Sequence, residues 1–229
     1  PFADKVVVGY PPIGSSKDFA RGLKIPSDPL EALEIVLNPR RVMGMDIGSI
    51  SRKGGTRRFA VSAGIGFDAA VCHEVCVSWW KKILNRIGLG KLSYAVVALD
   101  RLKKDRPAEM HITLDGGIEQ IFENTYFAAF MNLPFEGGGF RFCPDASPED
   151  SVLDIVILSG VSRLKALFLL PTAFTGKHVL FRGVTILRCR KAEMEMDRPM
   201  MIHTDGEPLF LRRQIRVGLM EEKLKVIVG

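Results

Sequence analysis

Ile202-His203-Thr204-Asp205-Gly206-Glu207-Pro208 is the stretch around which the chain is organised. An apolar run at 200–202 leads into it, and a second apolar run at 209–211 leaves it. Asp205 and Glu207 stand at i and i+2, so they project to one side if strand geometry persists through them. Two acids held together in this way can bind a cation, share a proton or activate a hydroxyl. Asp-Gly between two strands is also a β-hairpin signal, and the stretch alone leaves both interpretations open.

Length and composition place the chain among ordinary globular proteins. Its 229 residues are 47% hydrophobic and 25% charged, which is enough for a large core in one or two domains. The net charge of +6 favours an anionic partner such as a phosphate or an acidic membrane surface. The basic residues come in scattered pairs with little aromatic interleaving, so nucleic-acid binding is not expected.

Cysteine usage and the apolar runs bear on location. Cys72, Cys76, Cys143 and Cys189 form no C-x-x-C pair and no secretory leader is found, so reduced thiols and a cytoplasmic location are expected. Cys72 and Cys76 share a helical face, but no His or Cys pair completes a metal site, and structural thiols are expected. No apolar run approaches the ~20 residues that span a bilayer. Trp79-Trp80-Lys81-Lys82 suits either a membrane-surface contact or core packing with a solvated rim.

Hydrophobic periodicity and turn signals predict a few helices among many short strands. Helices are expected at 17–23 with Ser16 as N-cap, and at 30–37, 69–85, 91–104 and 162–174. Strands are expected at 6–8, 42–47, 59–63, 110–114, 118–122, 125–131, 152–158, 184–196, 215–219 and 224–228. Asp197-Arg198-Pro199 is expected to turn the chain, and a domain boundary is expected near residues 40–50. Because short turns join most strands, the sheets should be antiparallel.

Two loops carry candidate ligand groups. Residues 9–16 contain two prolines and two hydroxyls ahead of a helix start, where backbone donors suit a phosphate, although an ordinary strand-to-helix loop has the same composition. Residues 144–151 are rich in acids and hydroxyls ahead of a strand. Such oxygen-rich loops suit Mg²⁺ or Ca²⁺, and a solvated turn is the plainer alternative. Gly64-Ile65-Gly66 lacks the third glycine of a dinucleotide fingerprint, so it is a weak signal.

Three motifs, taken in order, resemble those of the diacylglycerol kinase catalytic-domain family, in particular the bacterial soluble lipid kinases, with sphingosine kinases more distant. Residues 12–21 are similar to P-x-G-T-x-N-D-F-A-R, and residues 137–154 to G-G-G-…-P-x-A-x-x-x-D-G-x-L-D. Residues 204–207 are similar to the family's D-G-E segment, and residues 59–69 to its strand and G-x-G-F-D-A helix start. The resemblance therefore covers nearly the whole chain.

The resemblance implies an α+β fold. A C-terminal antiparallel β-sandwich domain with a few helices would follow the remnant of an α/β nucleotide-binding domain. Residues 1–45 would be the C-terminal part of the first domain and residues 46–229 the sandwich, with the last strand returning to the first domain.

The same resemblance implies an ATP- and Mg²⁺-dependent kinase that phosphorylates a lipid hydroxyl, such as that of diacylglycerol, at the inner membrane surface without spanning it. Glu207 would be the general base, with Asp205 beside it in the turn. Ser15 would contact ATP phosphate. Asp150 would bind Mg²⁺ through its carboxylate, together with Ser147 and the main chain at Val152. Positioning and charge neutralisation of this kind are what phosphoryl transfer requires.

The chain departs from the family pattern at three points. Lys17 stands where the family has Asn, and Ser151 where it has Gly, which strains the loop if that position needs φ > 0. The family's G-G-D-G-T phosphate loop is not found, so residues 1–229 are expected to be inactive by themselves. The main alternative is a non-catalytic lipid- or nucleotide-binding module with a degenerate kinase fold. An NAD-kinase-like enzyme is a third reading, which the P-x-G-x-x-x-D-F-A-R segment disfavours.

Overall fold

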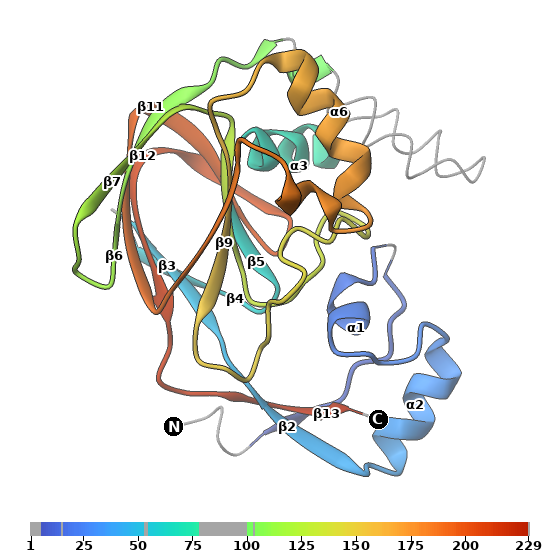
Figure 1. Cartoon of the computed structure of the whole chain (residues 1–229). Helices are drawn as coiled ribbons and strands as arrows, with labels where there is room; N and C mark the ends of the chain where they lie inside the picture. Colours follow the sequence, from blue (N-terminus) through green and yellow to red (C-terminus); the bar gives the residue numbers. More distant parts are fainter. Residues whose placement is uncertain (1–5, 15, 53–54, 78–99, 103, 229) are drawn as a thin grey trace.

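A computed structural model describes residues 6–14, 16–52, 55–77, 100–102 and 104–228. These residues form a large antiparallel sheet with two helices packed at one end, and a small three-stranded sheet with two further helices (Figure 1). The expected α+β class with an antiparallel sandwich is confirmed. The division into domains at residue 45 stays a prediction.

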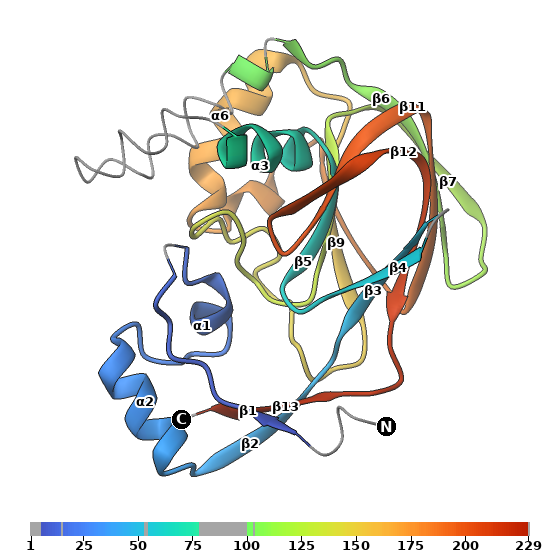
Figure 2. The ribbon, with the colours of Figure 1, turned by 180° about the vertical axis from the view of Figure 1, so that it is seen from behind.

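The small sheet is built from both ends of the described chain. Its strands are β1 (Val7–Val8), β2 (Arg41–Met45) and β13 (Leu224–Val228), and its helices are α1 (Asp18–Gly22) and α2 (Pro29–Leu37). The strand β13 lies in the middle, parallel to β1 and antiparallel to β2. Seen from behind, β13 crosses from the large sheet to lie beside β1 (Figure 2).

The two helices of the small unit begin differently. Asp28 caps α2, because its carboxylate accepts the main-chain N–H groups of Leu30 and Glu31, and Pro29 occupies the first helical position. The expected Ser16 cap of α1 is wrong. The residue before α1 is Lys17, in the left-handed conformation with φ 55°, and no side chain caps the five-residue helix.

The large sheet contains ten described strands, and its long path runs β10-β9-β8-β5-β11-β12-β3-β4, with β6 and β7 branching from β11. Most of its strands were expected from alternation or apolar runs. The 110–122 hairpin is confirmed, with its turn at Asp115 and Gly116, both at positive φ. The strands are β3 (Gly48–Arg52), β4 (Gly55–Phe59), β5 (Ser62–Gly66), β6 (Ala108–Leu114), β7 (Glu119–Thr125), β8 (Phe127–Met131), β9 (Leu153–Leu158), β10 (Val184–Cys189), β11 (Lys191–Thr204) and β12 (Glu207–Leu219).

The strand β11 corrects one expectation. The chain does not turn at 197–199 but runs on as one strand of 14 residues. Its first half pairs with β6 and its last residues with β5, and the register with β12 shifts between Glu195 and Met200. A bulge of this kind bends a strand, and Pro199, which has no N–H, lies where the ladder is interrupted. The proline therefore marks a corner of the sandwich instead of a hairpin.

The strand expected at 59–63 is also corrected. The strand β4 ends at Phe59 and β5 begins at Ser62, so Ala60 and Val61 form the junction between two strands. Both strands run through the large sheet, and β5 is buried along its whole length.

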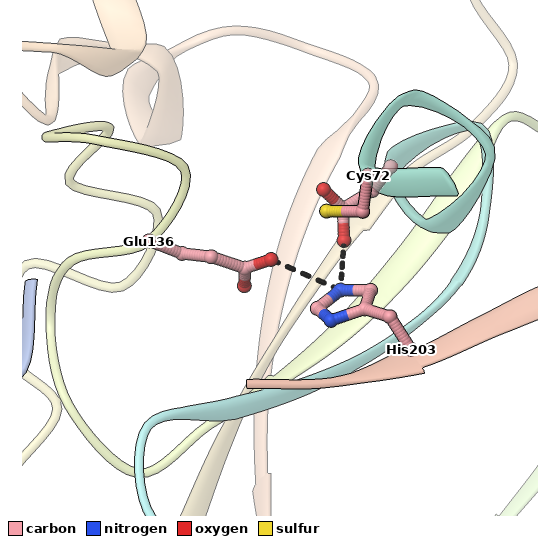
Figure 3. Close-up of side chains that lie close together, drawn as sticks. Cys72, Glu136 and His203 are labelled. Carbon is pink, nitrogen blue, oxygen red and sulfur yellow. Dashed lines mark hydrogen bonds and ion pairs between the residues drawn. The ribbon is translucent and has the colours of Figure 1, made fainter. Parts of the chain in front are cut away.

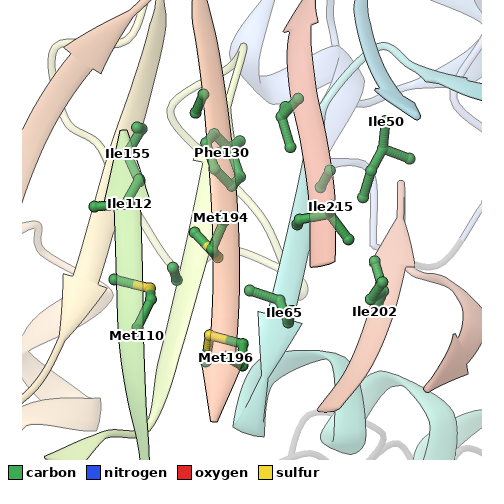
Figure 4. Close-up of a cluster of buried hydrophobic side chains, with 14 of the residues drawn as sticks. Ile50, Ile65, Met110, Ile112, Phe130, Ile155, Met194, Met196, Ile202 and Ile215 are labelled. Carbon is green, nitrogen blue, oxygen red and sulfur yellow. The ribbon is translucent and has the colours of Figure 1, made fainter. Parts of the chain in front are cut away.

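Two apolar clusters hold the large sheet together. One fills the inside of the curled sheet and includes Ile50, Ile65, Phe130 and Ile202 (Figure 4). The other lies between the sheet and the helices α3 (Phe67–Val77) and α6 (Arg163–Ala173), followed by the 3-10 helix η2 (Lys177–Leu180). Since β8 and β9 run between these clusters, both are buried on both faces, as their unbroken apolar sequences predict. Burying each large apolar side chain stabilises the fold by roughly 1.5–3 kcal/mol.

Part of the helical prediction concerns residues that the structure does not describe. The helix expected at 69–85 begins at Phe67 and is described as far as Val77. Its remainder, the Trp79-Trp80-Lys81-Lys82 segment and most of the helix expected at 91–104 lie outside the described residues. Among the residues that are described, no helix combines the length and the hydrophobicity that crossing a bilayer requires.

Candidate active site

All three sequence motifs meet at one cavity of about 330 Å³. It lies where the loop before α1, the β4–β5 junction, the glycine-rich loop after β8 and the β11–β12 turn come together. The motif residues that line it are Gly14, Ser16, Lys17, Asp18 and Phe19 from the first motif, Gly137 from the second with Glu136 just before it, and Asp205 and Gly206 from the third.

Asp18 joins the first motif to the second. Its buried carboxylate accepts a 2.6 Å hydrogen bond from the N–H of Gly138 and forms an ion pair with Arg21. Burial raises the pKa of Asp18, and the hydrogen bond from Gly138 acts in the opposite direction. Gly138 has φ 84°, a conformation that glycine adopts without strain, which explains the glycine-rich sequence at this contact.

Asp205 holds the β11–β12 turn against the β4–β5 junction. Its carboxylate accepts three main-chain hydrogen bonds of 2.8–3.0 Å, from Ala60, Val61 and Ser62. The backbone of Asp205 is left-handed, with φ 49°, so strand geometry does not persist through the motif. The hairpin interpretation of the stretch is therefore confirmed, and Asp205 has a defined structural role within it.

Glu207 follows the turn and points to a different partner. Its side chain is 69% exposed and forms an ion pair with Arg57 of β4. The two acids of the opening motif thus contact different groups, and the structure does not place them on one shared ligand position.

The acidic loop at 144–151 lies apart from the residues that line the cavity. The carboxylate of Asp150 pairs with Arg188 and accepts a 3.3 Å hydrogen bond from the N–H of Val152, and Ser147 is half-buried in the same loop. Arg188 also contacts the carboxylate of Asp154, at 3.2 Å. The other oxygen of that carboxylate, Oδ2, is buried and lacks a hydrogen bond within the described chain. Burial raises the pKa of Asp154, and Arg188 acts against it. An orphaned carboxylate oxygen among other oxygen donors fits a hard cation such as Mg²⁺.

The two residues that replace family residues, Lys17 and Ser151, both have left-handed backbone. Lys17 has φ 55° and Ser151 has φ 60°, so the condition for strain at Ser151 is met. The N–H of Ser151 donates to Asp46 at 2.8 Å, and Lys223 bridges Asp46 and the Ser151 hydroxyl. Lys17 donates to the carbonyl of Ser27 at 2.7 Å. Ser15, the predicted phosphate contact, lies outside the described residues.

A buried cluster beside the cavity was missed from the sequence. His203, which is fully buried, contacts Asp68 Oδ2 at 2.7 Å and Glu136 Oε1 at 3.0 Å through the same atom, Nε2. Glu136 reaches it from the glycine-rich loop and Cys72 from α3 (Figure 3). The one sequence signal was a histidine two residues before the Asp-Gly turn.

The proton on His203 can be located from its neighbours. The N–H of Gly206 points at Nδ1 from 3.2 Å, and in the neutral ring this contact places the proton on Nε2. That proton is donated to Asp68, the nearer carboxylate. Neither oxygen of Glu136 then has a hydrogen bond of good geometry within the described chain. Burial raises the pKa of Glu136 to about 7, the charge of Asp68 raises it further, and His203 and Ser62 act in the opposite direction.

The same cluster contains donors that a metal could use. One atom each from Asp68, Cys72, Glu136 and His203 lies within 4.8 Å of the others. A carboxylate, thiolate and imidazole set of this kind suits Zn²⁺ better than Mg²⁺. The sequence did not indicate these companions of Cys72, because they come from distant parts of the chain, and the expectation of a structural thiol stays a prediction.

Comparison with known proteins identifies the large sheet. Residues 60–227 match the YegS C-terminal NAD kinase beta sandwich-like domain. A diacylglycerol kinase of Mycobacterium tuberculosis is 30% identical over 204 residues, which are 88% of this chain and 63% of that protein. A diacylglycerol kinase of Bacillus subtilis is 27% identical over 209 residues, 90% of this chain and 64% of its own length. The chain thus spans a little less than two thirds of these relatives.

The fold is also found among solved structures. The crystal structure of a diacylglycerol kinase from Bacillus anthracis superposes with a TM-score of 0.61 at 15% identity, covering 94% of this chain and 64% of that one. At this identity the likeness concerns the fold, and it extends over nearly the whole chain.

Proposed function

Because this chain belongs to the family of diacylglycerol kinases and YegS-like lipid kinases, we propose that it is part of an ATP- and Mg²⁺-dependent kinase that phosphorylates a lipid hydroxyl, such as that of diacylglycerol. The observation that supports this function is the convergence of three separate motifs on one cavity. Residues that are more than a hundred positions apart in the sequence line the same space, which is the arrangement that positioning two substrates requires.

In this proposal the first motif faces ATP and the third faces the lipid. Ser15, with the neighbouring backbone, contacts the phosphate, and Lys17 adds a cation to the wall of the same cavity. Glu207 is the general base that takes the proton from the lipid hydroxyl, and Asp205 fixes the turn that carries it. Glu207 has to leave Arg57 first. Because an exposed ion pair contributes only about 0–1 kcal/mol, this release costs little.

Mg²⁺, when bound at the acidic loop, would neutralise its carboxylates and hold the loop in one conformation. Ser147, Asp150 and the main chain at Val152 would supply its protein ligands, with Asp154 as a buried neighbour. Arg188 now supplies the positive charge at Asp150, so it has to shift when a cation binds.

A face on α6 and η2 fits the membrane surface at which such a substrate is found. Leu164, Phe168, Phe174, Leu180 and Phe181 are exposed there, Phe168 to 75%. Residues 162–183 contain Arg163, Lys165, Lys177 and Arg182 and no acid at all. Exposed apolar side chains in a segment that carries cations and no acid match an anionic bilayer surface. We propose that this face rests on the inner side of the membrane, which makes the protein cytoplasmic and peripheral.

The test is transfer of labelled phosphate from ATP to diacylglycerol by the full-length protein. Glu207→Gln should abolish most turnover, whereas Glu193→Gln, another exposed Glu paired with an Arg, should leave turnover unchanged. Equal activity of the Glu207→Gln variant would remove Glu207 from the base role. A protein that transfers phosphate to none of the lipids tested would not be a lipid kinase.

A non-catalytic binding module is a second candidate, and one observation favours it. The two carboxylates that the resemblance assigns to catalysis and to metal binding, Glu207 and Asp150, are each paired with an arginine. Lys17 and Ser151 also occupy left-handed positions where the family has Asn and Gly. Binding of ATP or lipid without phosphate transfer would establish this second function.

A further inference from the structure

The Glu136 carboxylate is buried in a way that its surroundings do not satisfy. Its side chain is 5% exposed, both oxygens lack a hydrogen bond of good geometry within the described chain, and the residue lines the cavity where the motifs meet. The hydroxyl of Ser62, which lines the same cavity, is also buried without a partner there. An unsatisfied buried carboxylate costs more than an unsatisfied neutral group, so a donor that enters this cavity gains a strong hydrogen bond.

We propose that Glu136 binds the hydroxyl-bearing head group of the lipid substrate, with its carboxylate lying 3.0 Å from Nε2 of the buried His203. The inference rests on the proposed lipid kinase function and adds a binding residue to it. Glu136 accepts a hydrogen bond from the head group, while His203 is held by Gly206 on one side and Asp68 on the other. Through Glu136 and His203, the head group would be positioned next to Gly206, in the turn that precedes Glu207.

The neighbouring apolar cavity indicates what the head group is attached to. A narrow space of about 40 Å³ lies next to both the cluster and the main cavity. Asp68 and Cys72 of the cluster line it, and so does Gly137, which also lines the main cavity. Its other walls are apolar, with Phe67, Phe127 and Leu170 among them. A hydroxyl next to hydrocarbon fits this junction better than a sugar or an inorganic anion, and the two carboxylates disfavour an anionic head group.

A metal ion is the competing occupant of the cluster, and the proton position argues against it. A metal at Nε2 would displace the proton that is donated to Asp68 and move it to Nδ1. That proton would then face the N–H of Gly206, and two donors would oppose each other. Without a metal, every donor in the His203–Asp68–Gly206 arrangement has an acceptor.

The experiment measures lipid and ATP kinetics of the full-length protein with dioctanoylglycerol and, in a second arm, with a long-chain amino alcohol. Glu136→Gln should raise the lipid KM about tenfold or more, because it removes a charged acceptor, with the ATP KM unchanged and kcat at saturating lipid within a few-fold. Glu207→Gln should instead lower kcat, and Glu193→Gln should change neither. The lipid whose KM responds identifies the head group, and an unchanged KM for both overturns the proposal.

Direct binding keeps this inference separate from turnover. Calorimetric binding of dioctanoylglycerol should weaken as pH falls through about 7, where Glu136 gains a proton, with Asp68, His203 and Cys72 as the titratable groups that face it. This measurement uses the unmutated protein, so it holds even where Glu136→Gln fails to fold. Glu136-dependent binding without phosphate transfer would remove the kinase function and keep the site. Stoichiometric Zn²⁺ binding that Glu136→Gln abolishes would overturn the head-group assignment in favour of a metal.

Discussion

Asp18 and Gly138 lie 120 residues apart in the chain, and a 2.6 Å hydrogen bond joins the carboxylate of one to the main-chain N–H of the other. This contact links α1, in the small unit, to the glycine-rich loop of the large sheet. Gly138 allows the left-handed conformation of the loop, and Asp18 accepts the N–H group that this conformation directs towards it. Each motif residue therefore depends on the other.

Asp18→Asn should lower the free energy of unfolding by about 1–3 kcal/mol, because a charge-assisted hydrogen bond and the ion pair with Arg21 are lost together. The measurement is urea unfolding. Asp100→Asn is the control, since Asp100 forms an exposed helical ion pair with Lys104, and it should change stability by less than about 0.5 kcal/mol. Equal effects of the two substitutions would mean that the Asp18 contact does not hold the units together.

Lys17→Asn and Ser151→Gly should each stabilise the protein by roughly 1 kcal/mol, because left-handed backbone is costly for Lys and Ser and much less so for Asn and Gly. Thermal unfolding midpoints check this. Ser159→Gly, at a residue without positive φ, should be neutral or destabilising. A loss of stability in both replacements would show that the Lys17 and Ser151 side-chain contacts outweigh the backbone strain.

Asp205→Asn and Glu207→Gln should separate structure from chemistry. Asp205 accepts three N–H groups, so its loss should cost about 2–3 kcal/mol of stability as well as activity. Glu207 is exposed, so Glu207→Gln should change stability by less than about 1 kcal/mol while reducing kcat. Urea unfolding alongside kinetics distinguishes the two; equal stabilities for both variants would contradict the role assigned to Asp205.

Glu136 should make stability fall as pH rises. Its pKa is raised to about 7 in the folded protein, so between its unfolded value near 4.5 and about 7 the folded state holds the extra proton. Stability from this group is then highest below about 4.5 and declines as pH increases towards 7. The difference in unfolding free energy between the unmutated protein and Glu136→Gln, measured from pH 4.5 to 7.5, should shift in favour of the variant. A constant difference would show that Glu136 is ionised throughout.

Phe168→Glu should weaken binding to vesicles that contain anionic lipid, because it removes apolar contact and adds repulsion within the basic α6 face. Co-sedimentation at low and high salt measures this, with binding of the unmutated protein decreasing as salt rises. Ile118→Glu, at an equally exposed apolar residue on the β6–β7 hairpin, should leave binding unchanged. The α6 face is not the membrane contact if both substitutions act alike.

The sequence predicted local features well and long-range ones poorly. The strands at 110–114 and 118–122, which pair as a hairpin, and the buried strand β8 all follow from a few neighbouring residues. The end of β4 and the start of β5 do not, because Asp205, more than 140 residues away, binds the N–H groups of the junction. Pro199 was taken for a turn because bulges and turns share residue preferences.

The candidate site shows the same division. The Asp-Gly turn and the acidic loop could be found from the sequence, and the family resemblance supplied their proposed roles. The contact of His203 with Asp68 and Glu136 could not be found, since it joins β11, α3 and a loop that are separated by 67 residues or more in the chain. Burial, which makes this cluster chemically distinctive, is a property of the packed protein.

The position of β13 in the small sheet has a consequence for how the protein is made. On the ribosome, β1 and β2 emerge early, but the strand that separates and pairs with both emerges about 180 residues after β2. At synthesis rates of about 5–20 residues per second, the small unit waits roughly ten seconds or more for its central strand. The sandwich waits as well, because the hairpin of its central strands β11 and β12 ends only five residues before β13 begins, so we expect the two units to be completed together at the end of synthesis.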